Sequence, residues 1–89
     1  MRSTFIHKGS KHHSLIVFFA GWGMDDKPFR SLPSNGCDVL VCYDYTDLTP
    51  VALPGNEYST IFVFAWSFGV YAATLQMING GLHPNLAIA

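Results

Sequence analysis

The stretch Phe62–Ala73, FVFAWSFGVYAA, decides the fold, because a strand-like run passes directly into a helix-like one at a single serine, Ser67. The continuous apolar run Ser59–Ala65 is typical of a strand buried on both faces. Apolar and small residues then recur at intervals of three and four and predict a helix over Phe68–Asn79: Val70, Ala73, Thr74, Met77 and Ile78. With no loop between the two elements, the backbone at Ser67 must be strained, and its side chain should point outward at the carboxyl end of the strand.

Four further segments predict strands, and together with the helix they indicate an α/β domain with a mainly parallel sheet. They are Thr4–His7, Leu15–Phe19, Asp38–Tyr43 and the beginning of a strand within Asn85–Ala89. A short helix beginning at Asp25 or Asp26 and running through Phe29 and Leu32 is expected between the second and third strands. We expect Leu15–Phe19 to lie between Val39–Tyr43 and Ile61–Ala65, with the carboxyl ends of all three strands at one edge.

Length and composition exclude several classes of protein. The chain has 89 residues, 49% of them hydrophobic and 12% charged, and a formal net charge of −1. One small domain fits this length, and the charge provides no basic surface for nucleic acid. The apolar runs are too short to span a membrane, and no signal-peptide cleavage site follows Leu15–Ala20, so a cytoplasmic protein is expected. The basic cluster around His12 and His13 is interpreted as a solvated turn.

The two cysteines predict neither a disulfide framework nor a metal site. Cys37 and Cys42 would lie on opposite faces of an extended segment, roughly 16 Å apart at about 3.3 Å per residue. A disulfide requires its two Cα atoms to be within about 7 Å. We therefore expect two reduced thiols, and we expect neither a metal nor a cofactor.

The sequence Ala65-Trp66-Ser67-Phe68-Gly69 has the small-x-Ser-x-Gly pattern of a nucleophile elbow. Ser67 is the candidate nucleophile, and the start of the following helix favours a developing oxyanion. The main-chain N–H of Phe68 is the expected first oxyanion donor. The main-chain N–H of Trp22, in the loop Ala20-Gly-Trp-Gly23, is the expected second. Gly21 and Gly23 would let the backbone approach a substrate closely, and Trp66 is a candidate substrate contact.

Structural interpretations of the same residues remain open. Ser67 could be an incidental polar residue, and the Trp66 and Phe68 side chains could serve only in packing. Asp44 and Asp47 fit turn formers better than catalytic acids. His83 should lie at the amino ends of the strands, too far from Ser67 to act as its base.

Hydrolases with this elbow order their triad Ser, then Asp or Glu, then His. The last two would therefore follow Ala89, and the apolar ending also indicates truncation after the nucleophile helix and the start of the next strand. On this interpretation residues 1–89 are the amino-terminal part of a single α/β-hydrolase domain.

Three separated motifs, LIVFFAGWGMDDKPF, CYDY and FAWSFGVYAA, together resemble the short α/β-hydrolases of the BioG type. The resemblance runs from about Leu15 to the end of the chain. It implies a carboxylesterase of biotin biosynthesis that hydrolyses pimeloyl-[acyl-carrier protein] methyl ester, with the acyl-carrier protein as partner. Ser67 takes the place of the nucleophile, and Trp22 and Phe68 take those of the oxyanion donors.

The chain departs from this pattern in two respects. Many related hydrolases have His-Gly before the oxyanion loop, whereas this chain has Ala20-Gly21. The acid, the base and the substrate-covering cap have no counterpart, so these 89 residues alone are expected to be inactive. The alternatives are an α/β-hydrolase for another ester or thioester, and a non-catalytic fragment or pseudoenzyme. The reading frame beyond residue 89 would discriminate between them.

Overall fold

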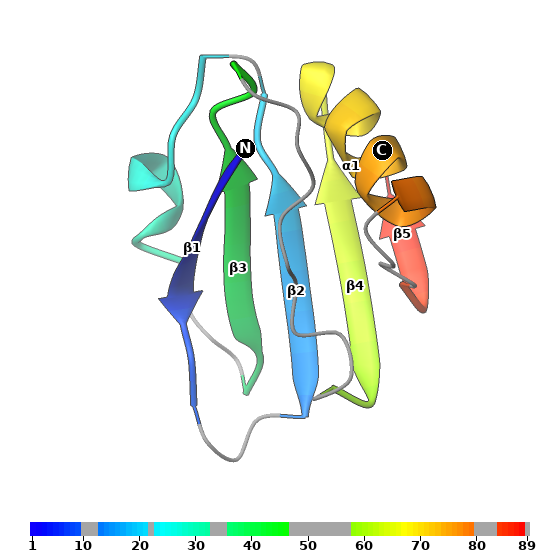
Figure 1. Ribbon diagram of the computed structural model, residues 1–89. Helices are drawn as coiled ribbons and strands as arrows, with labels where there is room; N and C mark the ends of the chain where they lie inside the picture. Colours follow the sequence, from blue (N-terminus) through cyan, green and yellow to red (C-terminus); the bar gives the residue numbers. More distant parts are fainter. Residues whose placement is uncertain (10–12, 22, 33–35, 47–57, 80–83, 89) are drawn as a thin grey trace.

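The computed structural model describes residues 1–9, 13–21, 23–32, 36–46, 58–79 and 84–88, which form one five-stranded sheet with the order β1-β3-β2-β4-β5 (Figure 1). The first strand is antiparallel to its neighbour, and the other pairs are parallel. The elements are β1 (Arg2–His7), β2 (Ser14–Phe19), the 3₁₀ helix η1 (Lys27–Phe29), β3 (Asp38–Tyr43), β4 (Thr60–Ala65), α1 (Phe68–Asn79) and β5 (Leu86–Ile88).

The predicted position of the second strand is confirmed, since β2 lies between β3 and β4. Leu15 is opposite Asp38 on one side and Ile61 on the other. Four positions later, Phe19 is opposite Cys42 and Ala65. The carboxyl ends of β2, β3 and β4 therefore meet at one edge of the sheet, and the segments that follow them are brought together there.

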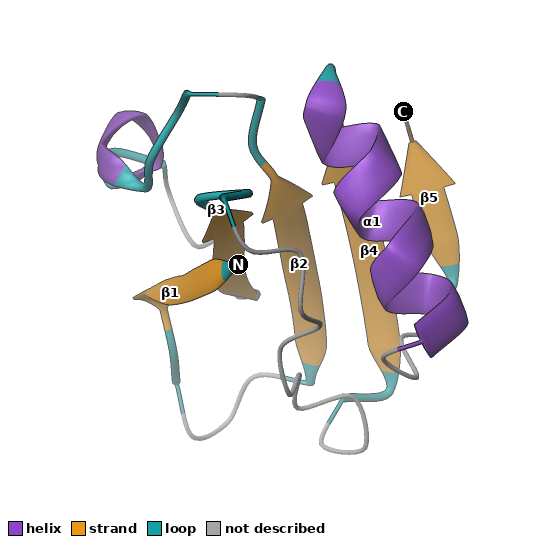
Figure 2. Cartoon of the chain, turned by 45° about the horizontal axis from the view of Figure 1, so that its top comes forward, coloured by secondary structure: helices purple, strands orange, loops and turns teal. Residues whose placement is uncertain are grey.

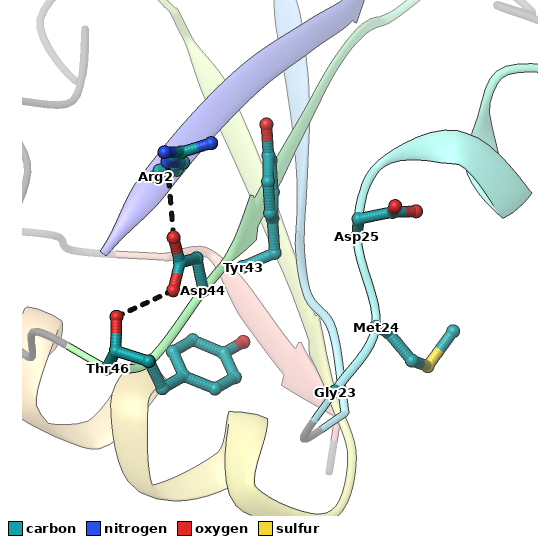
Figure 3. A pocket seen from close by; sticks show the side chains of 8 residues that line it. Arg2, Gly23, Met24, Asp25, Tyr43, Asp44 and Thr46 are labelled. Carbon is teal, nitrogen blue, oxygen red and sulfur yellow. Dashed lines mark hydrogen bonds and ion pairs between the residues drawn. The ribbon is translucent and has the colours of Figure 1, made fainter.

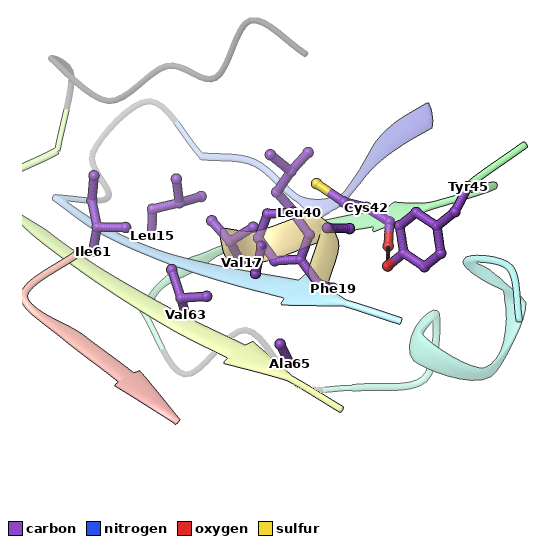
Figure 4. Packing of buried hydrophobic residues seen from close by; sticks show 11 residues of the cluster. Leu15, Val17, Phe19, Leu40, Cys42, Tyr45, Ile61, Val63 and Ala65 are labelled. Atoms are coloured by element: carbon purple, nitrogen blue, oxygen red, sulfur yellow. Dashed lines mark hydrogen bonds between the residues drawn. The ribbon is translucent and has the colours of Figure 1, made fainter. Parts of the chain in front are cut away.

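One face of the sheet carries the main core, and α1 lies across that face (Figure 2). Leu15, Val17 and Phe19 of β2 are fully buried there (Figure 4). Ala72 of the helix belongs to the same cluster and is also fully buried. The side chains between them on β2 are only partly buried, so the strand alternates although its sequence is continuously apolar. Each large apolar side chain that is removed from water contributes about 1.5–3 kcal/mol. This cluster therefore holds the helix against the sheet.

The opposite face carries a smaller aromatic cluster beneath η1. Phe29 packs there with Val41 and Ala20, and Phe18 and Trp66 lie against them. The predicted helix from Asp25 or Asp26 through Leu32 is shorter than expected. The Asp26 carboxylate accepts from Arg30 Nη2 at 2.9 Å and makes no side-chain cap, and a proline stands in the first turn.

The predicted bounds of the long helix are confirmed, and its buried face differs in part from the residue series that predicted the helix. Its buried residues are Gly69, Ala72, Ala73 and Gln76. Val70 and Ile78, which belong to the predicted apolar series, are 37% and 71% exposed. Small residues let the helix axis approach the sheet closely, so the contact face is set by side-chain size as well as by hydrophobicity.

Several predictions fall on residues that lie outside the described part of the chain. These are the turn at His12, the oxyanion donor Trp22, the turn former Asp47, the helix stop at Gly80 and Gly81, and the loop residue His83. Cys37 and Cys42 are not bridged, as expected. Among the described residues there is no helix long and apolar enough to span a membrane.

Candidate active site

Ser67 occupies the junction between β4 and α1 and has the strained geometry that its sequence predicts. Its φ is 56°, in the left-handed region that residues with a side chain rarely adopt, and the residue is exposed. Gly69 N–H donates to Trp66 O at 3.0 Å and Val70 N–H to Ser67 O at 3.2 Å, so the helical turn begins at once. The hydroxyl group is thus held out at the carboxyl edge of the sheet instead of lying in the core.

Gly69 brings the start of α1 against the end of β2. A Cβ atom at this position would lie 2.3 Å from Phe19 O and 2.6 Å from Ala20 O, both backbone atoms. Only glycine allows so close an approach. Gly69 thus allows α1 to approach the end of β2, and the elbow lies next to the loop that follows β2.

That loop begins with Ala20 and Gly21, which are both buried. Met24 N–H closes a turn onto Gly21 O at 3.1 Å, and Gly23 has a φ of 80° with open space around it. A Cβ atom on Gly21 would lie 3.2 Å from the indole nitrogen of Trp66. The predicted role of the two glycines in substrate approach is not tested by this geometry, but the loop does lie beside the elbow.

Trp66 packs within the aromatic cluster on the face opposite α1. Its ring centroid is 5.6 Å from that of Phe29 and 6.3 Å from that of Phe18. These contacts explain the residue as a packing group that also supports Gly21. A substrate contact by Trp66 stays a prediction.

Tyr45 is a buried residue of the site that the sequence analysis did not single out. Its hydroxyl group donates to Ala20 O at 2.6 Å, with Cys42 O also within reach at 3.2 Å. Its ring lies 5.6 Å from the ring of Phe68, centroid to centroid. A tyrosine two residues after a strand end was the available signal, but its partner Ala20 is 25 residues away in the sequence.

Asp44 is the second non-glycine residue with a positive φ among those described, at 61°, and it directly follows β3 at the same edge as Ser67. Its carboxylate accepts from the Thr46 hydroxyl at 2.8 Å and pairs with Arg2 Nε at 3.2 Å (Figure 3). The Thr46 hydroxyl, with a further contribution from Arg2, lowers the pKa of Asp44 below its usual value. The interpretation of Asp44 as a turn former fits this local bonding.

A cavity of about 330 Å³ opens beside this turn and the loop after β2 (Figure 3). Its lining residues come from the edge where β1 begins and β3 ends: Arg2, Gly23, Met24, Asp25, Tyr43, Asp44, Tyr45 and Thr46. One lining residue, Gly23, belongs to the loop after β2. Another, Tyr45, also packs against the ring of Phe68. The cavity therefore adjoins the loop after β2 and the turn after β3.

Other nucleophiles and bases among the described residues are poorly placed. Burial raises the pKa of the Cys42 thiol from 9.0 to about 12, so the thiol is neutral and enclosed. His7 pairs across from Val39, and His13 O accepts from the N–H of Ser59 just before β4. Both histidines therefore lie toward the amino ends of the parallel strands, away from Ser67. Within the described ranges no group of His, Cys, Asp and Glu side chains could hold a metal ion.

Comparisons with known proteins agree with this architecture. A family model described as pimeloyl-ACP methyl esterase BioG matches residues 1–89. A protein of Bacteroides fragilis named malonyl-[acyl-carrier protein] O-methyltransferase is 43% identical over 75 residues, covering 83% of this chain and 15% of that protein. An uncharacterized protein of Haemophilus influenzae is 40% identical over 75 residues, and the match covers 82% of this chain and 33% of that protein.

A solved structure also matches this fold. The crystal structure of BioG from Haemophilus influenzae matches with a TM-score of 0.73 and 31% identity. The match covers 98% of this chain and 39% of that one. The chain thus spans less than half the length of each of these three proteins.

Proposed function

Since the chain belongs to the BioG family, we propose that it supplies the nucleophile of a serine carboxylesterase that hydrolyses pimeloyl-[acyl-carrier protein] methyl ester. The observation that carries the proposal is the conformation of Ser67, exposed and strained between β4 and α1 with a φ of 56°. Strain of this kind is retained where a function needs it, because it costs about 1–3 kcal/mol. A serine that served only in packing would have no reason to occupy this position.

In the proposed reaction, Ser67 Oγ attacks the carbonyl carbon of the methyl ester and transfers its proton to a histidine base. The resulting oxyanion is stabilised by main-chain N–H groups, and we assign one of these to Phe68, the residue after the nucleophile. Collapse of the tetrahedral intermediate expels methanol, which takes a proton from the histidine, and leaves an acyl group on Ser67. Water then attacks this ester and releases the free carboxylate.

The second oxyanion donor is assigned to Trp22 on the sequence argument alone, because this residue lies outside the described part of the chain. The acid and the base of the triad are assigned to later residues of the complete protein, in the usual order for this elbow, and not to His83. We propose the acyl-carrier protein as the partner that presents the ester, and a cytoplasmic location, on the strength of the family. No cofactor is required by these steps.

The test uses the complete protein and a fluorophosphonate probe, followed by digestion and mass spectrometry. We expect the adduct on Ser67. Ser67→Ala should abolish both labelling and ester hydrolysis, a loss of roughly 10⁴-fold or more, with little change in stability. Ser59→Ala is the matched control, because the Ser59 hydroxyl bonds to His13 O at the opposite edge of the sheet. An adduct on another residue, or activity that survives Ser67→Ala, would defeat the proposal.

The substrate is tested separately. Hydrolysis of pimeloyl-[acyl-carrier protein] methyl ester should be much more efficient than hydrolysis of the free methyl ester of pimelate, if the carrier protein is a partner. Equal efficiency on both would leave the serine chemistry intact and would remove the carrier protein from the proposal.

A further inference from the structure

We infer that Tyr45 is a positioning residue that fixes the distance between the two sides of the oxyanion hole, an inference that rests on the function proposed above. One side is the loop that begins at Ala20, and the other is the start of α1 at Phe68. Tyr45 lies in the turn after β3 and contacts both sides: its hydroxyl group bonds to Ala20, and its ring packs against Phe68.

The hydroxyl group of Tyr45 holds the point where the chain leaves β2. It donates to Ala20 O at 2.6 Å and also lies 3.2 Å from Cys42 O. The N–H of Ala20 donates to the same Cys42 oxygen at 3.0 Å. Both backbone groups of Ala20 are therefore bonded toward β3 and its turn, which fixes the direction in which the chain enters Gly21.

The ring of Tyr45 supports the other side. Its centroid is 5.6 Å from that of Phe68, at an interplanar angle of 45°. The two sides also touch directly, because a Cβ atom on Gly69 would lie only 2.6 Å from Ala20 O. The oxygen of Ala20 thus lies between the Tyr45 hydroxyl and the first turn of α1. A shift of this oxygen would change the spacing between the loop and the helix.

The hydroxyl group is suited to a permanent role as a donor. Tyr45 is only 6% exposed, and burial raises the pKa of its phenol further above the usual value. The phenol therefore keeps its proton throughout the range in which an esterase works. A phenylalanine would fill the same volume and keep the ring contact with Phe68, so the hydrogen bond can be removed alone.

The oxyanion hole stabilises the transition state more than the bound substrate, so a displaced donor should lower kcat and leave KM nearly unchanged. Removing one oxyanion donor outright costs about 10²–10³-fold in kcat. Tyr45→Phe should displace a donor without removing it, so we expect kcat to fall by about 10-fold while KM changes less than about twofold. Affinity for a trifluoromethyl ketone, which forms a tetrahedral adduct with the serine, should fall by the same factor as kcat.

The experiment uses the complete protein, with kcat normalised to the folded fraction measured by circular dichroism. Tyr58→Phe is the matched control: the Tyr58 hydroxyl donates to the carboxylate of Asp38 at the start of β3, at the opposite edge of the sheet, and its loss should leave kcat unchanged. Incorporation of 4-aminophenylalanine at position 45 restores a donor on the same ring and should recover most of the lost kcat.

Each outcome decides the inference. An unchanged kcat in Tyr45→Phe, a loss that 4-aminophenylalanine does not rescue, an equal loss in Tyr58→Phe, or a Tyr45→Phe protein that does not fold would each overturn a positioning role. Failure of the proposed function has a different signature, because activity would then survive Ser67→Ala whatever happens at Tyr45.

Discussion

Replacement of Gly69 by alanine should destabilise the protein, although the same change at an ordinary helical position would stabilise it. Alanine is favoured over glycine within helices by about 1 kcal/mol. At Gly69, however, the added Cβ atom would lie 2.3 Å from Phe19 O and 2.6 Å from Ala20 O. Both contacts are with backbone atoms at the end of β2, which cannot rotate away as the tip of a side chain can.

The size of the effect follows from this geometry. Real Cβ atoms essentially never come within 3.0 Å of such neighbours, so α1 must move back from β2 by at least about 0.7 Å. Overpacking of a rigid site costs about 1–3 kcal/mol, and the absence of a flexible neighbour favours the upper end. After the gain in helix propensity, the free energy of unfolding should fall by about 2 kcal/mol, or about 30-fold in the ratio of folded to unfolded protein.

Denaturant unfolding of the complete protein, followed by circular dichroism, measures this change. Ile78→Ala is the control on the same helix, since Ile78 is 71% exposed and its loss should change stability by less than about 0.5 kcal/mol. Labelling of Ser67 should also slow in Gly69→Ala, because the elbow moves with the helix. A Gly69→Ala protein as stable as its parent, or more stable, would refute the reasoning that α1 rests on the backbone of β2.

Two further predictions concern titratable groups near the same edge. The pKa of Asp44 is lowered from its ordinary 3.8, so its stabilising contribution is present above that value and is lost as the pH falls through the lower, folded-state pKa. In Asp44→Asn the free energy of unfolding should therefore decrease less steeply as the pH is lowered. Urea unfolding at a series of acidic pH values measures this, and the same pH dependence in the variant and the parent would contradict the prediction. The pKa of Cys42 is raised to about 12, so at pH 8 only about one thiol in 10⁴ is the reactive thiolate. Iodoacetamide should therefore modify the partly exposed Cys37 first in the native protein, and peptide mapping that finds Cys42 modified equally fast would show that the thiol is not enclosed.

The sequence predicted those features that depend on hydrophobic pattern and on turn chemistry. The bounds Asp38–Tyr43 and Phe68–Asn79 agree with the structure, as do the central position of β2 and the strain at Ser67. Continuous apolar runs and an abrupt change of period are local signals, and each can be followed along a single stretch of chain.

The features that the sequence did not predict depend on size and on distance. The buried face of α1 includes Gly69 and Ala72 beside the predicted Ala73, because close approach favours small residues and a count of apolar ones overlooks the first two. The bond from Tyr45 to Ala20 joins residues 25 positions apart, and no local pattern marks it. The same holds for the ion pair that ties Arg2 to Asp44 across two strands.

The order of the strands has a consequence for the time course of synthesis. The edge of β2 that pairs with β4 must wait for residues far along the chain: the bond from Ser59 Oγ to His13 O, at the start of this pairing, spans 46 residues. At about 5–20 residues per second on the ribosome, that edge has no native neighbour for roughly two to nine seconds. The uncharged segment Leu15–Phe19 is β-prone and exposed to other chains during this interval. Slower translation of the stretch between the two strands should therefore lower the yield of native protein, whereas a chaperone that binds short apolar segments should raise it.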